Sequence, residues 1–67
     1  MPRTVSEVIK LLEADGWRLL WTRGSHRQFV HPKKVGRVTV AGKLSTDVPQ
    51  GTERNNFRQA GIEWRRR

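Results

Sequence analysis

The sequence has 67 residues, enough for one domain and close to the lower limit at which a single apolar core holds a fold. It has no cysteine, which excludes disulfides and thiolate metal sites, and the lack of a long apolar run or an export signal favours a cytoplasmic protein without a membrane span. Its 14 Lys and Arg residues against 6 Asp and Glu residues give a net charge of +8, which favours nucleic acid as the partner.

The first predicted element is a helix at residues 4–15. Thr4 and Glu7 have the spacing of a capping box, in which each side chain binds the backbone of the other residue. Apolar side chains then recur with the period of a helix, at Val5, Val8, Ile9 and Leu12. Gly16 follows and can take the left-handed conformation that ends a helix, so we expect the helix to stop near Asp15.

Three short strands are predicted after this helix. Bulky residues alternate with others over residues 17–22, a Gly-Ser pair at 24–25 marks a turn, and a second strand covers residues 26–31. Proline and glycine mark another turn at 32–36, and a third strand with valine at every second position follows at 37–40. Short connections between consecutive strands favour an antiparallel meander.

The first strand carries two tryptophans. Strict alternation places Trp17, Leu19 and Trp21 on one face of the strand. Trp17 is expected in the core, whereas Trp21 stands where a polar residue is expected. Three roles are open for Trp21: a core residue, a platform on which a base stacks, or a surface that a partner covers.

A second helix is predicted after an irregular loop at residues 43–51. Thr52 is the expected N-cap, and the charge of Glu53 would complement the helix dipole. Gly61 is expected to end the helix in a Schellman motif. Phe57 and Ile62 would then form the apolar pair that accompanies this cap.

The predicted fold class is α+β, with elements in the order α-β-β-β-α. We expect a three-stranded antiparallel sheet with both helices on one face, which leaves the other face open to a long, charged ligand. The double-stranded-RNA-binding fold (dsRBD) has the same order. One domain is expected at residues 1–64, with Trp64 as a last apolar contact. The three arginines at 65–67 are expected to form a basic tail that is either solvated or in contact with phosphate.

Several motifs occur at specific spacings along nearly the whole chain. They are an N-terminal capped helix ending in Gly16-Trp17, then Arg23-Gly24-Ser25-His26, Phe29, His31-Pro32, Val38-Thr39-Val40, Gly51-Thr52 and Arg58-Gln59-Ala60-Gly61-Ile62. Together these motifs resemble the HicA (YcfA-like) family of type II toxin–antitoxin systems, whose toxins are small RNA-cleaving proteins.

The resemblance implies a dsRBD-like fold and an endoribonuclease that cleaves mRNA. The histidine after Gly-Ser, here His26, is regarded as catalytic in that family. The resemblance also implies an acidic HicB-like antitoxin that masks the His26 face. No metal or small-molecule cofactor is expected. The chain departs from the family at Glu53 and Asn56, where apolar residues often face the sheet, so a loosely packed or rotated second helix is expected.

The chemistry of RNA cleavage suits an imidazole at position 26. Cleavage without a metal needs the 2′-OH deprotonated, the leaving 5′-oxygen protonated and the phosphorane charge stabilised, and one histidine can make either proton transfer but not both in one step. His31 is a poor second group, because five residues of extended strand place it about 16 Å from His26 and on the opposite face. If Phe29 points into the core, Gln28 shares the open side with His26, and Arg27 shares the core side with His31.

Side chains near His26 are predicted to bind RNA. Arg23 and either Lys33 or Lys34 are candidates to stabilise the negative transition state, and Ser25 is a candidate to orient the imidazole. The full set of predicted RNA-binding residues is Arg23, Ser25, Arg27, Gln28, Lys33 and Lys34.

Other readings of the same residues stay open. Taken alone, His26 also fits a turn or strand-edge residue, and His31 before proline fits a structural or exposed one. The main alternative function is a non-catalytic basic RNA-binding module of dsRBD-like fold that reads A-form shape through phosphate and 2′-OH contacts. A structural or ribosome-associated interaction protein is a third hypothesis. A membrane surface fits less well, because the cations are scattered along the whole chain.

Overall fold

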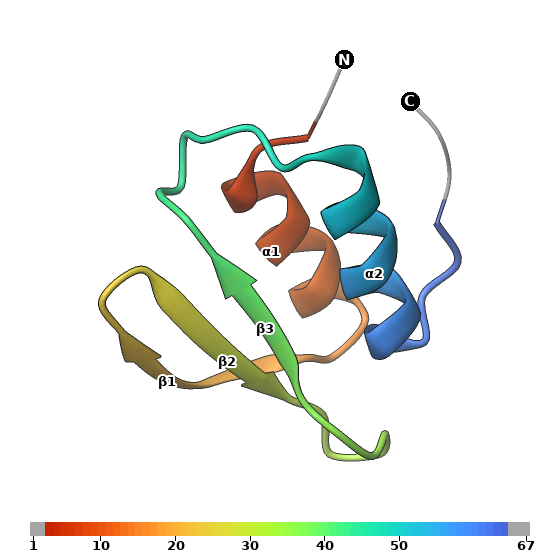
Figure 1. Ribbon diagram of the computed structural model, residues 1–67. Coiled ribbons are helices and arrows are strands. Elements are labelled where there is room, and N and C mark those ends of the chain that lie inside the picture. The colour runs from red at the N-terminus through yellow and green to blue at the C-terminus, as the bar shows by residue number, and fades with distance from the viewer. Residues whose placement is uncertain (1–2, 65–67) are drawn as a thin grey trace.

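The computed structural model of the protein describes residues 3–64 (Figure 1). Its elements are α1 (Val5–Ala14), β1 (Arg18–Arg23), β2 (His26–Val30), β3 (Val38–Ala41) and α2 (Gln50–Ala60). The strands form one antiparallel sheet in the order β1-β2-β3, and α1 and α2 lie side by side on one face of it. The predicted fold class and element order are confirmed. The predicted basic tail at 65–67 lies outside the described residues.

The first helix begins and ends as predicted. The amide of Thr4 donates to Glu7 Oε1 at 2.9 Å, and the amide of Glu7 donates to Thr4 Oγ1 at 3.3 Å, which completes the capping box. Asp15 is the C-cap, and Gly16 follows with a φ of 104°. A side chain at Gly16 would also place its Cβ 2.8 Å from His31 Nε2, so glycine is needed there for space as well as conformation.

The core lies between the helices and the sheet. Trp17 is 1% exposed, and its indole N–H donates to the carbonyl of Ala60 at 3.2 Å, which joins the start of β1 to the end of α2. The predicted core position of Trp17 is confirmed. The buried apolar residues of this cluster are Val5, Val8, Leu12, Trp17, Phe29, Val38, Val40, Val48, Phe57 and Ala60.

A β-bulge in β1 breaks the alternation expected from the sequence. Leu19 pairs with Phe29, but Trp21 pairs with Gln28, which leaves Leu20 as the extra residue. Phe29 and Gln28 are neighbours in β2 and point to opposite faces, so Leu19 and Trp21 do so as well. The prediction that they share a face is wrong. Every residue of β1 is exposed, since the helix layer packs mainly against β3.

The second helix starts earlier than predicted. Pro49 is its N-cap, and Thr52 lies inside the first turn, so the predicted N-cap is wrong. The preceding residue, Val48, is buried and its amide donates to the carbonyl of Arg3 at 2.8 Å, which fixes the chain just before the helix. Proline has no amide hydrogen, so the N-cap residue itself has no donor to satisfy, and no side chain caps the helix.

The predicted Schellman motif at the end of α2 is confirmed. Gly61 has a φ of 68°, its amide donates to Arg58, and the amide of Ile62 donates to Phe57 at 2.9 Å. Ile62 is partly buried against the core, whereas Phe57 is fully buried.

Two polar residues of α2 face inward and are buried. Glu53 is 4% exposed and Asn56 is 5% exposed. The Glu53 carboxylate accepts from Arg3 Nη1 at 2.5 Å and from Trp64 Nε1 at 2.6 Å. These two donors replace the water that the carboxylate loses on burial. The expected loose or rotated helix is therefore not observed.

Candidate nucleic-acid interface

His26 is the first residue of the central strand. It pairs with Arg23 of β1 on one side and with Ala41 of β3 on the other. Directly paired residues of neighbouring strands point to the same face of a sheet. Phe29 is buried under the helices, so His26, three positions earlier in β2, points to the face that the helices leave bare. The imidazole side of the sheet is as predicted.

The hairpin turn before His26 is tied to the end of β3. Gly24 has a φ of 58°, as the first position of a type II′ turn requires. The amide of Gly42 donates to the carbonyl of Ser25 at 3.1 Å. Arg27 Nη1 donates to the carbonyl of Gly42 at 2.8 Å and to that of Ser25 at 3.3 Å. Arg27 therefore holds the turn from the helix side, and the structure does not bring it to the His26 face.

Eight residues of the three strands share the bare face, which is termed the open face. They are Arg18, Trp21, Arg23, His26, Gln28, Val30, Thr39 and Ala41. Thr39 Oγ1 donates to Gln28 Oε1, which fixes the side chain opposite Trp21. The guanidinium carbon of Arg23 lies 5.8 Å from the centroid of the Trp21 ring, within the range of a cation–π contact.

Lys33 and Lys34 lie away from His26. They follow the far end of β2, and about 13 Å of extended strand separates the two ends. Lys34 Nζ donates to Asp15 Oδ2 at 2.5 Å and to the carbonyl of Ala60 at 3.0 Å. Lys34 thus connects the ends of the two helices. The RNA-binding role of both lysines stays a prediction, as does that of Ser25.

The second histidine is held by the fold. His31 Nδ1 accepts from the amides of Lys33 at 2.9 Å and Lys34 at 3.2 Å, so this nitrogen carries no proton. The proton is then on Nε2, which donates to the carbonyl of Asp15 at 2.7 Å. The side chain is only 8% exposed and packs edge-on against Trp17. His31 is a structural residue, which was one of the two roles predicted for it.

The contact with Lys34 also changes the acidity of Asp15. The pKa of the Asp15 carboxyl is lower than its usual value of 3.8. The main cause is the hydrogen bond that Lys34 donates, and the positive charge of Lys34 lowers the pKa further, whereas partial burial opposes the change. The carboxylate is thereby kept charged at the junction of α1 with the sheet.

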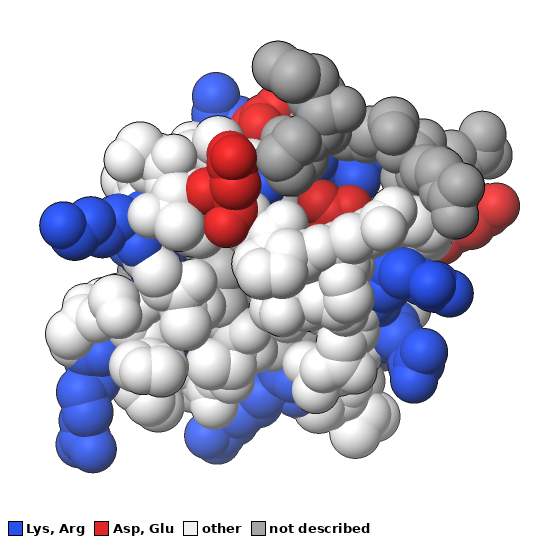
Figure 2. All heavy atoms as spheres, turned by 45° about the horizontal axis from the view of Figure 1, so that its top comes forward, with Lys and Arg blue, Asp and Glu red and all other residues white. Residues whose placement is uncertain are grey.

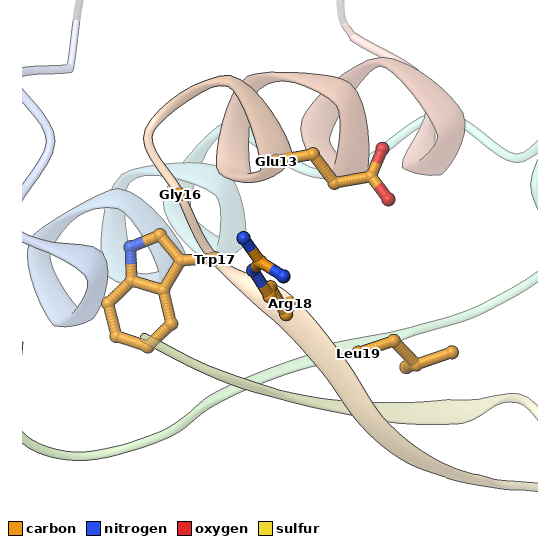
Figure 3. Close-up of a pocket in the computed structure, with 5 residues that line it drawn as sticks. All are labelled: Glu13, Gly16, Trp17, Arg18 and Leu19. Carbon is orange, nitrogen blue, oxygen red and sulfur yellow. The ribbon is translucent and has the colours of Figure 1, made fainter. Parts of the chain in front are cut away.

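A hollow on the helix side does not compete with the open face as a site. It is lined by Glu13, Gly16, Trp17, Arg18 and Leu19 (Figure 3). Figure 3 shows the Trp17 indole turned toward α2, while Glu13 extends from α1 on the other side. Neither Trp21, Arg23 nor His26 lines it. Within residues 3–64, no group of three or more His, Cys, Asp or Glu side chains is placed to hold a metal ion.

Positive charge is spread over the molecule. Figure 2 shows Lys and Arg side chains standing out around the edge of the face in view.

A comparison with protein families matches residues 5–62 to the family described as the HicA toxin of bacterial toxin–antitoxin. This chain belongs to the HicA toxin family. A search of curated proteins found no match.

Membership of the HicA toxin family implies a toxin of a toxin–antitoxin system and hence an antitoxin partner. In the described part of this HicA toxin, residues 3–64, no helix is long and apolar enough to cross a membrane. The family match spans the whole sheet and both helices, so it covers the open face and its histidine.

Sequence reasoning did not place Trp21 on the open face of this HicA toxin. The missing information was the bulge at Leu20, which moves Trp21 to the same side as His26. One signal was present in the sequence: Leu19, Leu20 and Trp21 are three consecutive large apolar residues. A regular strand buried on one face cannot bury all three, so such a run indicates a bulge or an uncovered strand.

Proposed function

We propose that this HicA toxin is an endoribonuclease that cleaves mRNA without a metal ion and uses His26 as its general acid or base. The observation that carries the proposal is the exposed imidazole of His26 on the open face, with Arg23 at the paired position of the neighbouring strand, in a protein with a net charge of +8. The imidazole can move a proton, the guanidinium can bind a phosphate, and the bare sheet gives an RNA strand room to lie across both.

In the proposed reaction the ribose 2′-oxygen attacks the neighbouring phosphorus. The O2′–P bond forms and the P–O5′ bond breaks, which yields a 2′,3′-cyclic phosphate and a 5′-hydroxyl. His26 takes the proton of the 2′-OH or supplies the proton of the 5′-oxygen. Arg23 stabilises the charge of the phosphorane. The strands contain no carboxylate and no second imidazole, so water makes the other proton transfer, and the reaction is slow.

The proposal includes an acidic HicB-like antitoxin that covers the His26 face. The family match implies an antitoxin, and a face that carries cations attracts an acidic protein as well as RNA. An antitoxin bound there would exclude the substrate, so inhibition needs no change of shape in the toxin.

The first prediction concerns His26. The His26→Ala variant should cleave a labelled single-stranded RNA in EDTA about 10² to 10⁴ times more slowly than the wild type, because it lacks the proton-transfer group. Gln59→Ala, an exposed polar residue of α2 on the other side of the molecule, is the control and should cleave at the wild-type rate. Cleavage by His26→Ala at the wild-type rate would reject the proposed role.

A non-catalytic RNA-binding module is the second candidate. It is favoured by the single proton-transfer group on the strands, since binding needs none. The same assay separates the two functions. Salt-sensitive RNA binding without any cleavage by the wild type would support the module, whereas cleavage that leaves a 2′,3′-cyclic phosphate supports the enzyme.

A further inference from the structure

Trp21 differs from the other tryptophans in its surroundings. Trp17 is buried and its N–H donates to the backbone of α2, and the N–H of Trp64 donates to the buried carboxylate of Glu53. Trp21 is 42% exposed on the open face, on the strand that the helices do not cover. A large ring held in solvent beside a candidate catalytic group is a binding surface more than a packing element.

The bulge sets the distance between this ring and the imidazole. Trp21 lies opposite Gln28, and Gln28 is two residues from His26 on the same face. Trp21 and His26 are therefore diagonal neighbours, whose α-carbons are about 7–8 Å apart in an antiparallel sheet. This is the span of a single nucleotide, so one RNA residue can reach from the ring to the imidazole.

Arg23 is a neighbour of both groups on the same face. Its guanidinium carbon is 5.8 Å from the centroid of the Trp21 ring, and its backbone pairs with His26. The open face thus presents an aromatic ring, a cation and an imidazole in succession. A nucleotide presents the matching groups in the same succession: a flat base, a phosphate and a ribose hydroxyl.

We propose that the toxin binds RNA as an unpaired strand, with one base stacked on Trp21 and the adjacent phosphate between Arg23 and His26. This inference rests on the proposed function and specifies the form of its substrate. A base within a duplex has both faces covered by its neighbours and cannot stack on a side chain, whereas an unpaired base can. Stacking accepts every base, so it selects single-stranded RNA without selecting one sequence.

The test compares RNA affinities in the His26→Ala background, where cleavage does not interfere. Fluorescence anisotropy of a labelled single-stranded RNA and of the same sequence paired in a duplex gives both affinities. Adding Trp21→Ala should weaken single-strand binding about 5- to 150-fold, the equivalent of one stacked base, and change duplex binding little. Trp21→Phe keeps a ring and should retain most of the affinity. Leu19→Ala, also exposed but on the other face, is the matched control.

Unchanged single-strand binding by the Trp21→Ala protein would overturn the inference, and so would an equal loss for the single strand and the duplex. A loss confined to antitoxin binding would also overturn it, because Trp21 would then belong to a protein interface. Thermal unfolding of each variant checks that the fold is kept. The proposed catalysis is tested by cleavage and this inference by affinity, so either can fail while the other stands.

Discussion

At the scale of single residues, the two histidines show how surroundings divide one chemistry into two roles. His31 has both ring nitrogens engaged by backbone groups and packs on Trp17, so its proton is fixed on Nε2. His26 lies exposed at the start of β2, on the side away from the core. The separation of the two rings followed from strand geometry alone. The amide contacts of His31 did not, because they depend on how the chain turns after Pro32.

The charged contact of Asp15 with Lys34 predicts a loss of stability in acid. The folded-state pKa of Asp15 is below the ordinary value of 3.8. The stability that the charged carboxylate contributes is therefore fully present above about pH 3.8 and is lost as the pH falls through the lower folded-state pKa. Urea unfolding at a series of pH values from neutral to below 4 should show this loss. In Asp15→Asn and in Lys34→Gln, the unfolding free energy should fall less steeply with pH in that range. A fall as steep as that of the wild type in both variants would contradict the role given to the Asp15–Lys34 contact.

At the scale of elements, local signals predicted most of the fold and non-local contacts accounted for the errors. The capping box of α1 and the Schellman motif of α2 are made by residues close in sequence, and both were predicted. The start of α2 was missed because Val48 is held by the distant Arg3. The bulge at Leu20 was missed because it depends on pairing with β2.

The buried carboxylate of α2 is a second case in which a distant partner decides the outcome. Glu53 looks unfavourable on the inner side of a helix, but Arg3 and Trp64 come from the two ends of the described chain to bind it. An isolated buried charge would be strongly destabilising, whereas a buried carboxylate that accepts two hydrogen bonds is tolerated. The sequence contains each of these residues without indicating that they meet.

Removing the charge of Glu53 should therefore destabilise the whole fold. Glu53→Gln removes the charge that accepts from Arg3 and Trp64 in the interior, and the expected loss is about 3 kcal/mol of unfolding free energy, measured by urea denaturation. Glu13→Gln, an exposed carboxylate of α1, is the control and should change stability by about 0.5 kcal/mol or less. Equal effects of the two substitutions would show that the buried contact contributes nothing special.

At the scale of the whole molecule, the fold is a slab of two layers, with Cα extents of 31 × 28 × 17 Å. The helices form one layer and the sheet forms the other, so one broad surface of the sheet stays bare. With a net charge of +8, this slab attracts a polyanion over much of its surface, and within residues 3–64 the open face is the one that combines that attraction with a well-exposed imidazole.

Salt dependence should reveal which cations touch RNA. In a plot of log affinity against log salt concentration for single-stranded RNA, the magnitude of the slope should be smaller by about 0.7 for Arg23→Gln than for the wild type, because one phosphate contact is removed. Lys10→Gln, which removes an exposed cation from α1, should leave the slope unchanged. Equal slopes for wild type and Arg23→Gln would place RNA elsewhere on the surface.

The double contact of Glu53 has one more consequence. Since Arg3 and Trp64 donate to the same oxygen, the first and last described residues are neighbours in space. A short peptide could join them, and the chain could then be opened at Val35, a fully solvated position in the turn before β3. A circular permutant of this kind would carry its new ends beyond the end of β2 that lies opposite the turn presenting His26.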